Sequence, residues 1–320
     1  MRKLIMLALL AAGIAALFTI PAAANPRGTN GKILIGNADN SVTGQGQVYT
    51  VDPDGSDLSL LANDADASQW SPEGSRIPLF TASGEGILNF DTGSFTQLGL
   101  PDTLYQDLAL FCGEWSPDGQ RLACGGFGHT DPSLNGAYTV RSSDAGDLQR
   151  VTSNPGGDDG ASDWSPNGKR LVFTRISETV YGLFTVKLDG SGMRQITPPG
   201  MNFNAGNGSW SPQGNEILFS AHVPSDEHST IWVVHANGSG LRQIPVPGCG
   251  GLDTSPTWVG CFNPRWSPDG KKIVFGRQPA TTLQRDIYTV NADGSGLFRV
   301  TNTPDVEEFN ADWGTHPLTP

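Results

Sequence analysis

Trp115-Ser116-Pro117-Asp118-Gly119 is one of five copies of a short phrase that decides the fold of this chain. Each copy has the form Trp-Ser-Pro-x-Gly, and a sixth, shortened copy reads Trp313-Gly314. Consecutive copies lie 45, 49, 46, 56 and 47 residues apart, which is the signature of an internal structural repeat. The repeated tryptophans are Trp70, Trp115, Trp164, Trp210, Trp266 and Trp313.

The phrase itself predicts a hairpin turn. Proline presets φ at the first central position of a type I turn, and the glycine takes the left-handed conformation that closes the hairpin. The tryptophan should therefore end one strand, and the next strand should begin just after the glycine. These following strands are apolar on both faces, as a strand packed between two neighbouring sheets requires, at residues 170–173, 216–219 and 272–275.

Two more strands complete each unit. A third strand, such as residues 183–186 or 287–290, precedes an Asp-Gly-Ser-Gly or Asn-Gly-Ser-Gly turn, and a fourth strand follows that turn. Outside the N-terminal segment there is no helical periodicity. Four strands in a unit of this length predict an all-β fold, a six-bladed β-propeller of four-stranded blades.

The two ends of the repeat region do not contain whole blades. The first strand, residues 32–35, corresponds to the strand after a Trp-Ser-Pro-x-Gly phrase, whereas Trp313 belongs to the innermost strand of a blade. We therefore expect the ring to be closed by pairing of the N- and C-terminal strands. Closure of this kind leaves few free sheet edges.

Residues 1–24 are expected to be a cleaved signal peptide. Met1-Arg2-Lys3 is basic, residues 4–20 are apolar, and Ala22-Ala23-Ala24 is a small-residue cleavage site. The competing interpretation is a transmembrane anchor, for which the apolar run is borderline in length. Residues 25–320 should then form a single propeller domain without a membrane span, in the periplasm or secreted.

The charge balance narrows the choice of partners. The chain carries a formal net charge of −12, with 32 acidic and 20 basic side chains. Nucleic acids and anionic membranes attract basic surfaces, so neither is expected as a partner. A protein partner or a cation is compatible with the charge, and we expect the ring to be monomeric.

Four cysteines in an exported chain indicate disulfides. Cys112 and Cys124 are equidistant from Asp118, the centre of a predicted turn, so they should face each other across two strands. Cys249 and Cys261 bracket the longest insertion in the repeat. We predict the pairs Cys112–Cys124 and Cys249–Cys261; a zinc site of four cysteines is the alternative, although no Cys-x-x-Cys pair is present.

The repeat phrases resemble those of a known family. Trp-Ser-Pro-Asp-Gly followed by Lys-Ile-Val-Phe, then Ile-Tyr-Thr-Val and Asp-Gly-Ser-Gly, is similar to the TolB-like, WD40-like (PD40) propeller repeats of the bacterial envelope. The resemblance covers nearly all of residues 32–313. It implies an exported, non-enzymatic propeller that acts as a protein-binding or scaffold module of the cell envelope.

The candidate binding site is the mouth of the channel. The innermost strand of each blade begins a few residues before its tryptophan, and polar residues recur there: Asp66, Asp159, Asn204, Asn263, Glu307 and Glu308. Converging carboxylates and amides suit a basic peptide segment or Ca²⁺, although such residues are also common on solvated rims. Blade three departs from this pattern with Leu108, Leu110 and Phe111, which form either a contact patch for a partner or a surface packed under a loop.

No catalytic constellation is evident. The tryptophans are expected to pack between blades, and no Gly-x-Ser-x-Gly nucleophile motif occurs. No cofactor is expected beyond a possible Ca²⁺. The alternative function is a metal-dependent propeller enzyme, a lactonase or a carbohydrate lyase or hydrolase. Such an enzyme should melt at a higher temperature with Ca²⁺ and lose that gain in EDTA.

Overall fold

The computed structural model describes residues 29–40, 45–99, 107–199, 208–223, 226–250, 260–278, 284–304 and 306–318. The predicted signal peptide and Asn204 lie outside these ranges. The helix found within them is the short 3₁₀ turn η1 (Pro132–Leu134), and no helix in this part of the chain is long and apolar enough to cross a membrane.

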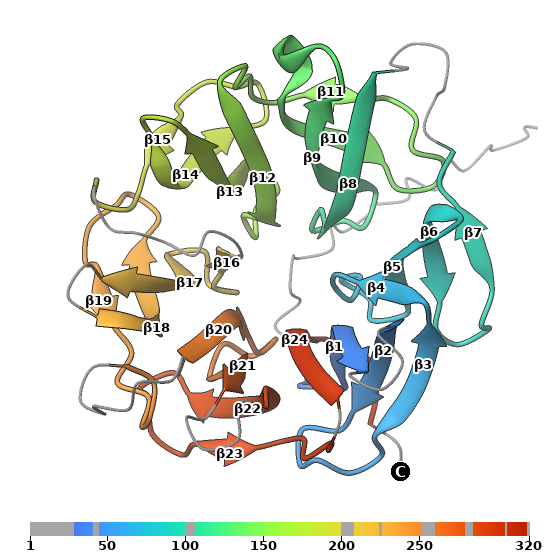
Figure 1. The fold of residues 1–320 in the computed structure, drawn as a ribbon, viewed down its shortest axis with the longest axis vertical. Helices are drawn as coiled ribbons and strands as arrows, with labels where there is room; N and C mark the ends of the chain where they lie inside the picture. The colour runs from blue at the N-terminus through green and yellow to red at the C-terminus, as the bar shows by residue number, and fades with distance from the viewer. Residues whose placement is uncertain are drawn as a thin grey trace, which may run out of the picture.

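Six antiparallel sheets of four strands each surround a common centre, which confirms the predicted propeller (Figure 1). Blade 1 contains β24 (Val306–Trp313), β1 (Ile33–Asn40), β2 (Gln45–Val51) and β3 (Ser59–Asn63). Blade 2 contains β4 (Ala65–Ala67), β5 (Arg76–Thr81), β6 (Gly84–Asn89) and β7 (Phe95–Gln97). Blade 3 contains β8 (Leu108–Trp115), β9 (Arg121–Gly128), β10 (Gly136–Arg141) and β11 (Gln149–Arg150).

The other three blades follow the same order from the centre outward. Blade 4 contains β12 (Gly157–Trp164), β13 (Arg170–Ser177), β14 (Tyr181–Lys187) and β15 (Arg194–Gln195). Blade 5 contains β16 (Ser209–Trp210), β17 (Glu216–Val223), β18 (Asp226–His235) and β19 (Arg242–Gln243). Blade 6 contains β20 (Gly260–Trp266), β21 (Lys272–Gln278), β22 (Asp286–Asn291) and β23 (Phe298–Arg299).

The turn phrase folds as predicted, and its serine has a role of its own. Gly119 has a φ of +66°, and its N–H donates to the carbonyl oxygen of Ser116 at 2.8 Å. The hydroxyl oxygen of Ser116 accepts the N–H of Arg121 on the next strand, also at 2.8 Å. The serine thus ties the end of one strand to the beginning of the next, and four other copies repeat this contact.

The core lies between the blades. The six repeated tryptophans are 2–5% exposed, in agreement with the packing role predicted for them. Phe173, Phe219 and Phe275 occupy the same position on three second strands and are almost completely buried. Each blade is therefore held by apolar contacts on both of its faces.

The ring closes through its two ends. Strand β1 pairs with β24 in antiparallel register from Ile33↔Trp313 to Asn40↔Val306, as predicted (Figure 1). The indole Nε1 of Trp313 donates to the carbonyl oxygen of Gly31 at 3.0 Å. A contact between residues 282 positions apart thus completes blade 1.

Both predicted disulfides form. Cys112 and Cys124 are direct partners in the β8–β9 pair, with a Cα–Cα distance of 4.0 Å. Cys249 follows β19 of blade 5, and its bond to Cys261 on β20 links blade 5 to blade 6. Paired cysteines are consistent with an exported protein.

Candidate functional site

Backbone bulges direct polar side chains toward the centre of the ring. The register of the innermost strand shifts after Cys112 in β8, after Ala161 in β12 and after Phe262 in β20. A bulge inserts an extra residue and re-aims the side chains that follow it. In each strand the next paired residue lies directly before the repeated tryptophan: Glu114, Asp163 and Arg265.

These residues belong to a ring of polar side chains, here called the pre-tryptophan ring. All six positions before a repeated tryptophan are polar: Gln69, Glu114, Asp163, Ser209, Arg265 and Asp312. Members of the ring join adjacent blades, because a carboxylate oxygen of Asp163 accepts the N–H of Trp210 at 2.7 Å. Asp312 accepts the N–H of Trp70 in the same way at 2.8 Å.

Arg265 provides the positive charge of this ring. Arg265 is 8% exposed, and its guanidinium donates to the carbonyl oxygen of Ser162 at 3.0 Å and lies 4.0 Å from the carboxylate of Glu114. Burial raises the pKa of Asp163 and of Asp312, and the charge of Arg265 opposes this rise in both. The carboxyl groups of Glu114, Asp163 and Asp312 thus share one arginine at the centre of the propeller.

Burial is the largest influence on the pKa values of these carboxyl groups. It raises the pKa of Glu114 to about 7 and that of Asp163 to about 6, although Arg265 opposes the shift in both. Burial likewise raises the pKa of Glu308 to about 7. These groups therefore hold protons in the folded chain at pH values where the unfolded chain has released them.

This arrangement predicts a stability that falls as pH rises. Glu114 and Glu308 titrate near 7 when folded but near 4.5 when unfolded, so between these values the folded state binds more protons. Linkage then requires the free energy of unfolding to decrease through that window, by at least about 1 kcal/mol from pH 5 to pH 8. Urea unfolding across this range is the measurement, and Glu308→Gln should flatten the profile. A wild-type profile that rises from pH 5 to pH 8 would contradict the assignment.

Two adjoining cavities form the channel mouth. Their shared wall consists of Ser68, Phe80, Phe111 and Glu114. The polar half has a volume of about 310 Å³, and its other lining residues are Asp66, Ala67, Asn263, Arg265, Asn310 and Ala311. The glycine half has a volume of about 280 Å³, and its other lining residues are Gly113, Gly125, Gly126, Phe127, Asp158, Asp159, Gly160 and Ala161.

Two of the predicted mouth residues meet in the polar half. Asp66 lies on β4 and is half-buried, which raises the pKa of its carboxyl group. Asn263 lies at the β20 bulge with a φ of +51°, and its amide donates to the carbonyl oxygen of Phe309 at 3.1 Å. This left-handed backbone turns Asn263 toward blade 1, where its amide also meets Asn310.

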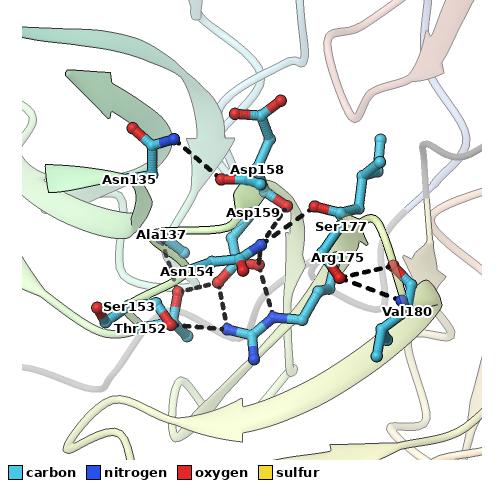
Figure 2. A network of polar contacts seen from close by, with 12 residues as sticks. Asn135, Ala137, Thr152, Ser153, Asn154, Asp158, Asp159, Arg175, Ser177 and Val180 are labelled. Atoms are coloured by element: carbon cyan, nitrogen blue, oxygen red, sulfur yellow. Dashed lines mark hydrogen bonds and ion pairs between the residues drawn. The ribbon is translucent and has the colours of Figure 1, made fainter. Parts of the chain in front are cut away.

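Asp159 lines the glycine half but is committed to a contact between blades (Figure 2). Its carboxylate accepts two hydrogen bonds from Arg175, at 2.8 and 2.6 Å, and others from Thr152 and Asn154. Thr152 belongs to blade 3, so the carboxylate ties blade 4 to blade 3. The neighbouring Asp158 is exposed, because successive side chains of a strand point to opposite faces.

Glu308 makes the equivalent contact between blades 1 and 6. Its carboxylate accepts hydrogen bonds from Thr301, from the hydroxyl of Thr303 at 2.8 Å and from the N–H of Ile287 at 3.2 Å. The side chain is 1% exposed. Glu307 is exposed and acts electrostatically on Arg285. Neither side chain borders the polar or the glycine half of the mouth.

In the part of the chain that the structure describes, no three His, Cys, Asp or Glu side chains gather as metal ligands would. The possible Ca²⁺ stays a prediction, to be tested by the melting experiment with EDTA.

Comparison with known proteins identifies the architecture. No protein-family model and no curated protein sequence matches the chain. TolB from Acinetobacter baumannii matches with a TM-score of 0.68 and 17% identity, over 90% of this chain and 67% of that one. The putative TolB from Agrobacterium tumefaciens matches with a TM-score of 0.63 and 19% identity, over 89% and 99%. The fold is TolB-like.

The same architecture occurs in proteins with other activities. An oligogalacturonate lyase in complex with manganese matches this TolB-like propeller with a TM-score of 0.54 and 12% identity, over 85% of this chain and 79% of that one. Identities this low show a shared fold, and a shared fold does not determine a shared function.

The structure adds residues that the sequence interpretation missed. The pre-tryptophan ring was visible in principle, because the position before each repeated tryptophan is polar in all six units of this TolB-like propeller. Phe111 was noted as a break in the polar pattern, but its stacking partners Phe80 and Phe127 were not. They come from separate strands, and no spacing in the sequence connects them.

Proposed function

We propose that this chain is an exported, non-enzymatic propeller of the bacterial cell envelope, periplasmic or secreted, that binds a protein partner at its channel mouth. The observation that supports this most directly is the mouth itself, where exposed phenyl rings stand beside carboxyl groups. Phe111 is 51% exposed and Phe127 is 37% exposed, although both are large apolar side chains. Exposed aromatic side chains that line a cavity are typical of binding surfaces.

The shape of the mouth favours a chain segment as the ligand. The two halves adjoin along the wall that contains Phe111 and Glu114, so one ligand can enter both. One half offers Asp66 and Asn263, and the other offers a glycine-lined space beside Phe127. An extended peptide can place alternate side chains in two such neighbouring cavities.

Site-specific photo-cross-linking tests the proposal. A photoreactive phenylalanine analogue at position 111 should yield a discrete adduct in the host cell envelope. The matched control is the same analogue at Phe95, which is 41% exposed but lies on β7, an outermost strand. Adducts of equal yield and identity from the two positions would show that the mouth is not the binding site.

A second variant fills the mouth without removing any side chain. A Cβ at Gly160 would meet no atom within 4 Å, so Gly160→Leu should occupy the glycine half while the blade stays folded. Combined with the analogue at position 111, it should reduce the adduct about tenfold, as loss of a central contact does. Undiminished cross-linking in this variant would place the partner outside the glycine half.

A further inference from the structure

Three phenyl rings form a ladder in the mouth: Phe80 and Phe111 belong to the wall shared by the two halves, and Phe127 lines the glycine half. The rings of Phe80 and Phe111 lie 6.5 Å apart with an interplanar angle of 19°, and those of Phe111 and Phe127 lie 5.0 Å apart at 20°. They come from β5, β8 and β9, so the ladder crosses from blade 2 to blade 3. A phenyl ring has a negative face and a positive edge, so a cation is stabilised where the ladder exposes a ring face.

A disulfide and a hydrogen bond at the residue next to Phe111 fix the position of the ladder. Phe111 is adjacent to Cys112, whose disulfide to Cys124 links β8 to β9. The N–H of Cys112 is also bound by the carboxyl group of Glu85 on β6 of the preceding blade. A rigid aromatic surface loses little conformational entropy when a ligand binds, which favours a built site over an adaptable loop.

Carboxyl groups flank the ladder on both sides. Asp66 lines the polar half, Asp158 is exposed in the glycine half, and Glu114 stands in the shared wall. The chain as a whole carries a net charge of −12. Arg265 also lines the polar half and balances the charge of Glu114, so Asp66 and Asp158 supply the negative charge that attracts a cation to the mouth.

The molecule itself shows how it accommodates a guanidinium group. Arg285 lies between Phe262 and Phe309, with its Cζ atom 4.5 Å from each ring centroid, and Glu307 acts on it electrostatically. Arg76 lies over Trp115 at the same distance. A cation over an aromatic face is stabilised by the ring quadrupole, and the planar, weakly hydrated guanidinium suits such stacking better than an ammonium group does.

We propose that the Phe80–Phe111–Phe127 ladder, with Asp66 and Asp158, binds an arginine side chain of the partner. The guanidinium lies against the exposed rings of Phe111 and Phe127, and a flanking carboxylate balances its charge. This inference rests on the proposed function and specifies the chemistry of the bound segment.

Calorimetric titration of the full chain with three capped tripeptides tests the inference. Tri-arginine should bind, tri-lysine should bind more weakly, and tri-citrulline, which is nearly isosteric but neutral, should bind about tenfold more weakly than tri-arginine. Binding of tri-arginine should also weaken with added salt. Equal affinity for arginine and citrulline would overturn the inference, and equal affinity for arginine and lysine would overturn the preference for a guanidinium.

Paired variants locate the binding. Phe127→Leu keeps an apolar side chain but removes the ring, and it should weaken tri-arginine binding roughly three- to tenfold. Phe298→Leu is the matched control, because Phe298 is 44% exposed on the outermost strand β23. Asp158→Asn should weaken binding as Phe127→Leu does. Identical affinities in Phe127→Leu and Phe298→Leu would overturn the assignment.

The two proposals fail in different ways. If cross-linking from position 111 succeeds while tri-citrulline binds as well as tri-arginine, a partner binds at the mouth but the arginine chemistry is wrong. If tri-arginine binds at the ladder but position 111 gives no adduct in the envelope, the proposed function fails and the cation site stands. Melting curves of Phe127→Leu that coincide with the wild type exclude misfolding as the cause of weaker binding.

Discussion

Arg265→Met is expected to lower the free energy of unfolding by about 3–5 kcal/mol at pH 8, because it leaves buried carboxyl groups without their shared cation. Methionine preserves most of the apolar volume of the arginine stem, so the loss reports the charge. At pH 5 the loss should be smaller, since Glu114 and Asp163 then hold protons in the folded chain and need no cation. Urea unfolding at the two pH values is the measurement.

The matched control for Arg265→Met is an arginine in an exposed pair. Arg141 binds Asp144 at 2.8 Å, but the two side chains are 52% and 54% exposed. Arg141→Met should therefore leave the urea midpoint close to that of the wild type at both pH values, as exposed pairs contribute little. If the two variants lose equal stability, or if the loss in Arg265→Met does not depend on pH, charge does not hold the pre-tryptophan ring together.

Asp159→Ala is expected to have the second largest effect, a loss of about 3 kcal/mol. The side chain of Asp159 is completely buried, and its removal leaves Arg175 without its two charged hydrogen bonds. It also removes the acceptor that links Thr152 of blade 3 to blade 4 (Figure 2). Thermal and urea unfolding of the variant should both show the loss.

The adjacent residue provides the control. Asp158→Ala changes the same residue type one position earlier on the same strand, but its side chain is exposed. We expect a change within about 0.5 kcal/mol of the wild type. If Asp158→Ala and Asp159→Ala lose equal stability, the contact of Asp159 with blade 3 does not stabilise the propeller. Because Asp159 supports a contact between blades and Asp158 does not, a binding experiment at the mouth should alter Asp158 rather than Asp159.

Much of the fold could be predicted because it repeats. The Trp-Ser-Pro-x-Gly spacing determined the number of blades, and the position of Trp313 within its blade predicted closure with the first strand. The Cys112–Cys124 disulfide followed from symmetry about the turn at Asp118, and the Cys249–Cys261 disulfide followed from the long insertion that these two cysteines bracket. Each of these inferences depends on the spacing of residues along the chain, and the structure confirms all of them.

The site was harder to predict because it depends on the direction of single side chains. Side chains on the innermost strand alternate between the two neighbouring blades, so the carboxylates of Asp159 and Glu308 are held in contacts between blades. Asp159 also lines the glycine half of the mouth, whereas Glu308 borders neither half. Bulges then shift this alternation by one residue and direct Glu114 and Arg265 to the centre. A bulge of this kind leaves no clear mark in the sequence, and neither does the meeting of Phe80 with Phe111.

The pairing of β24 with β1 has a consequence for how the molecule is made. Until the strand that contains Trp313 has been synthesised, blade 1 lacks its innermost strand, and the edge of β1 with Ile33 and Leu34 has no cover. Contacts between distant parts of a chain form late, because the entropy of closing the loop must be lost first. A chain that stops short of Trp313 therefore cannot complete blade 1, and the unpaired edge of β1 is then free to pair with another strand.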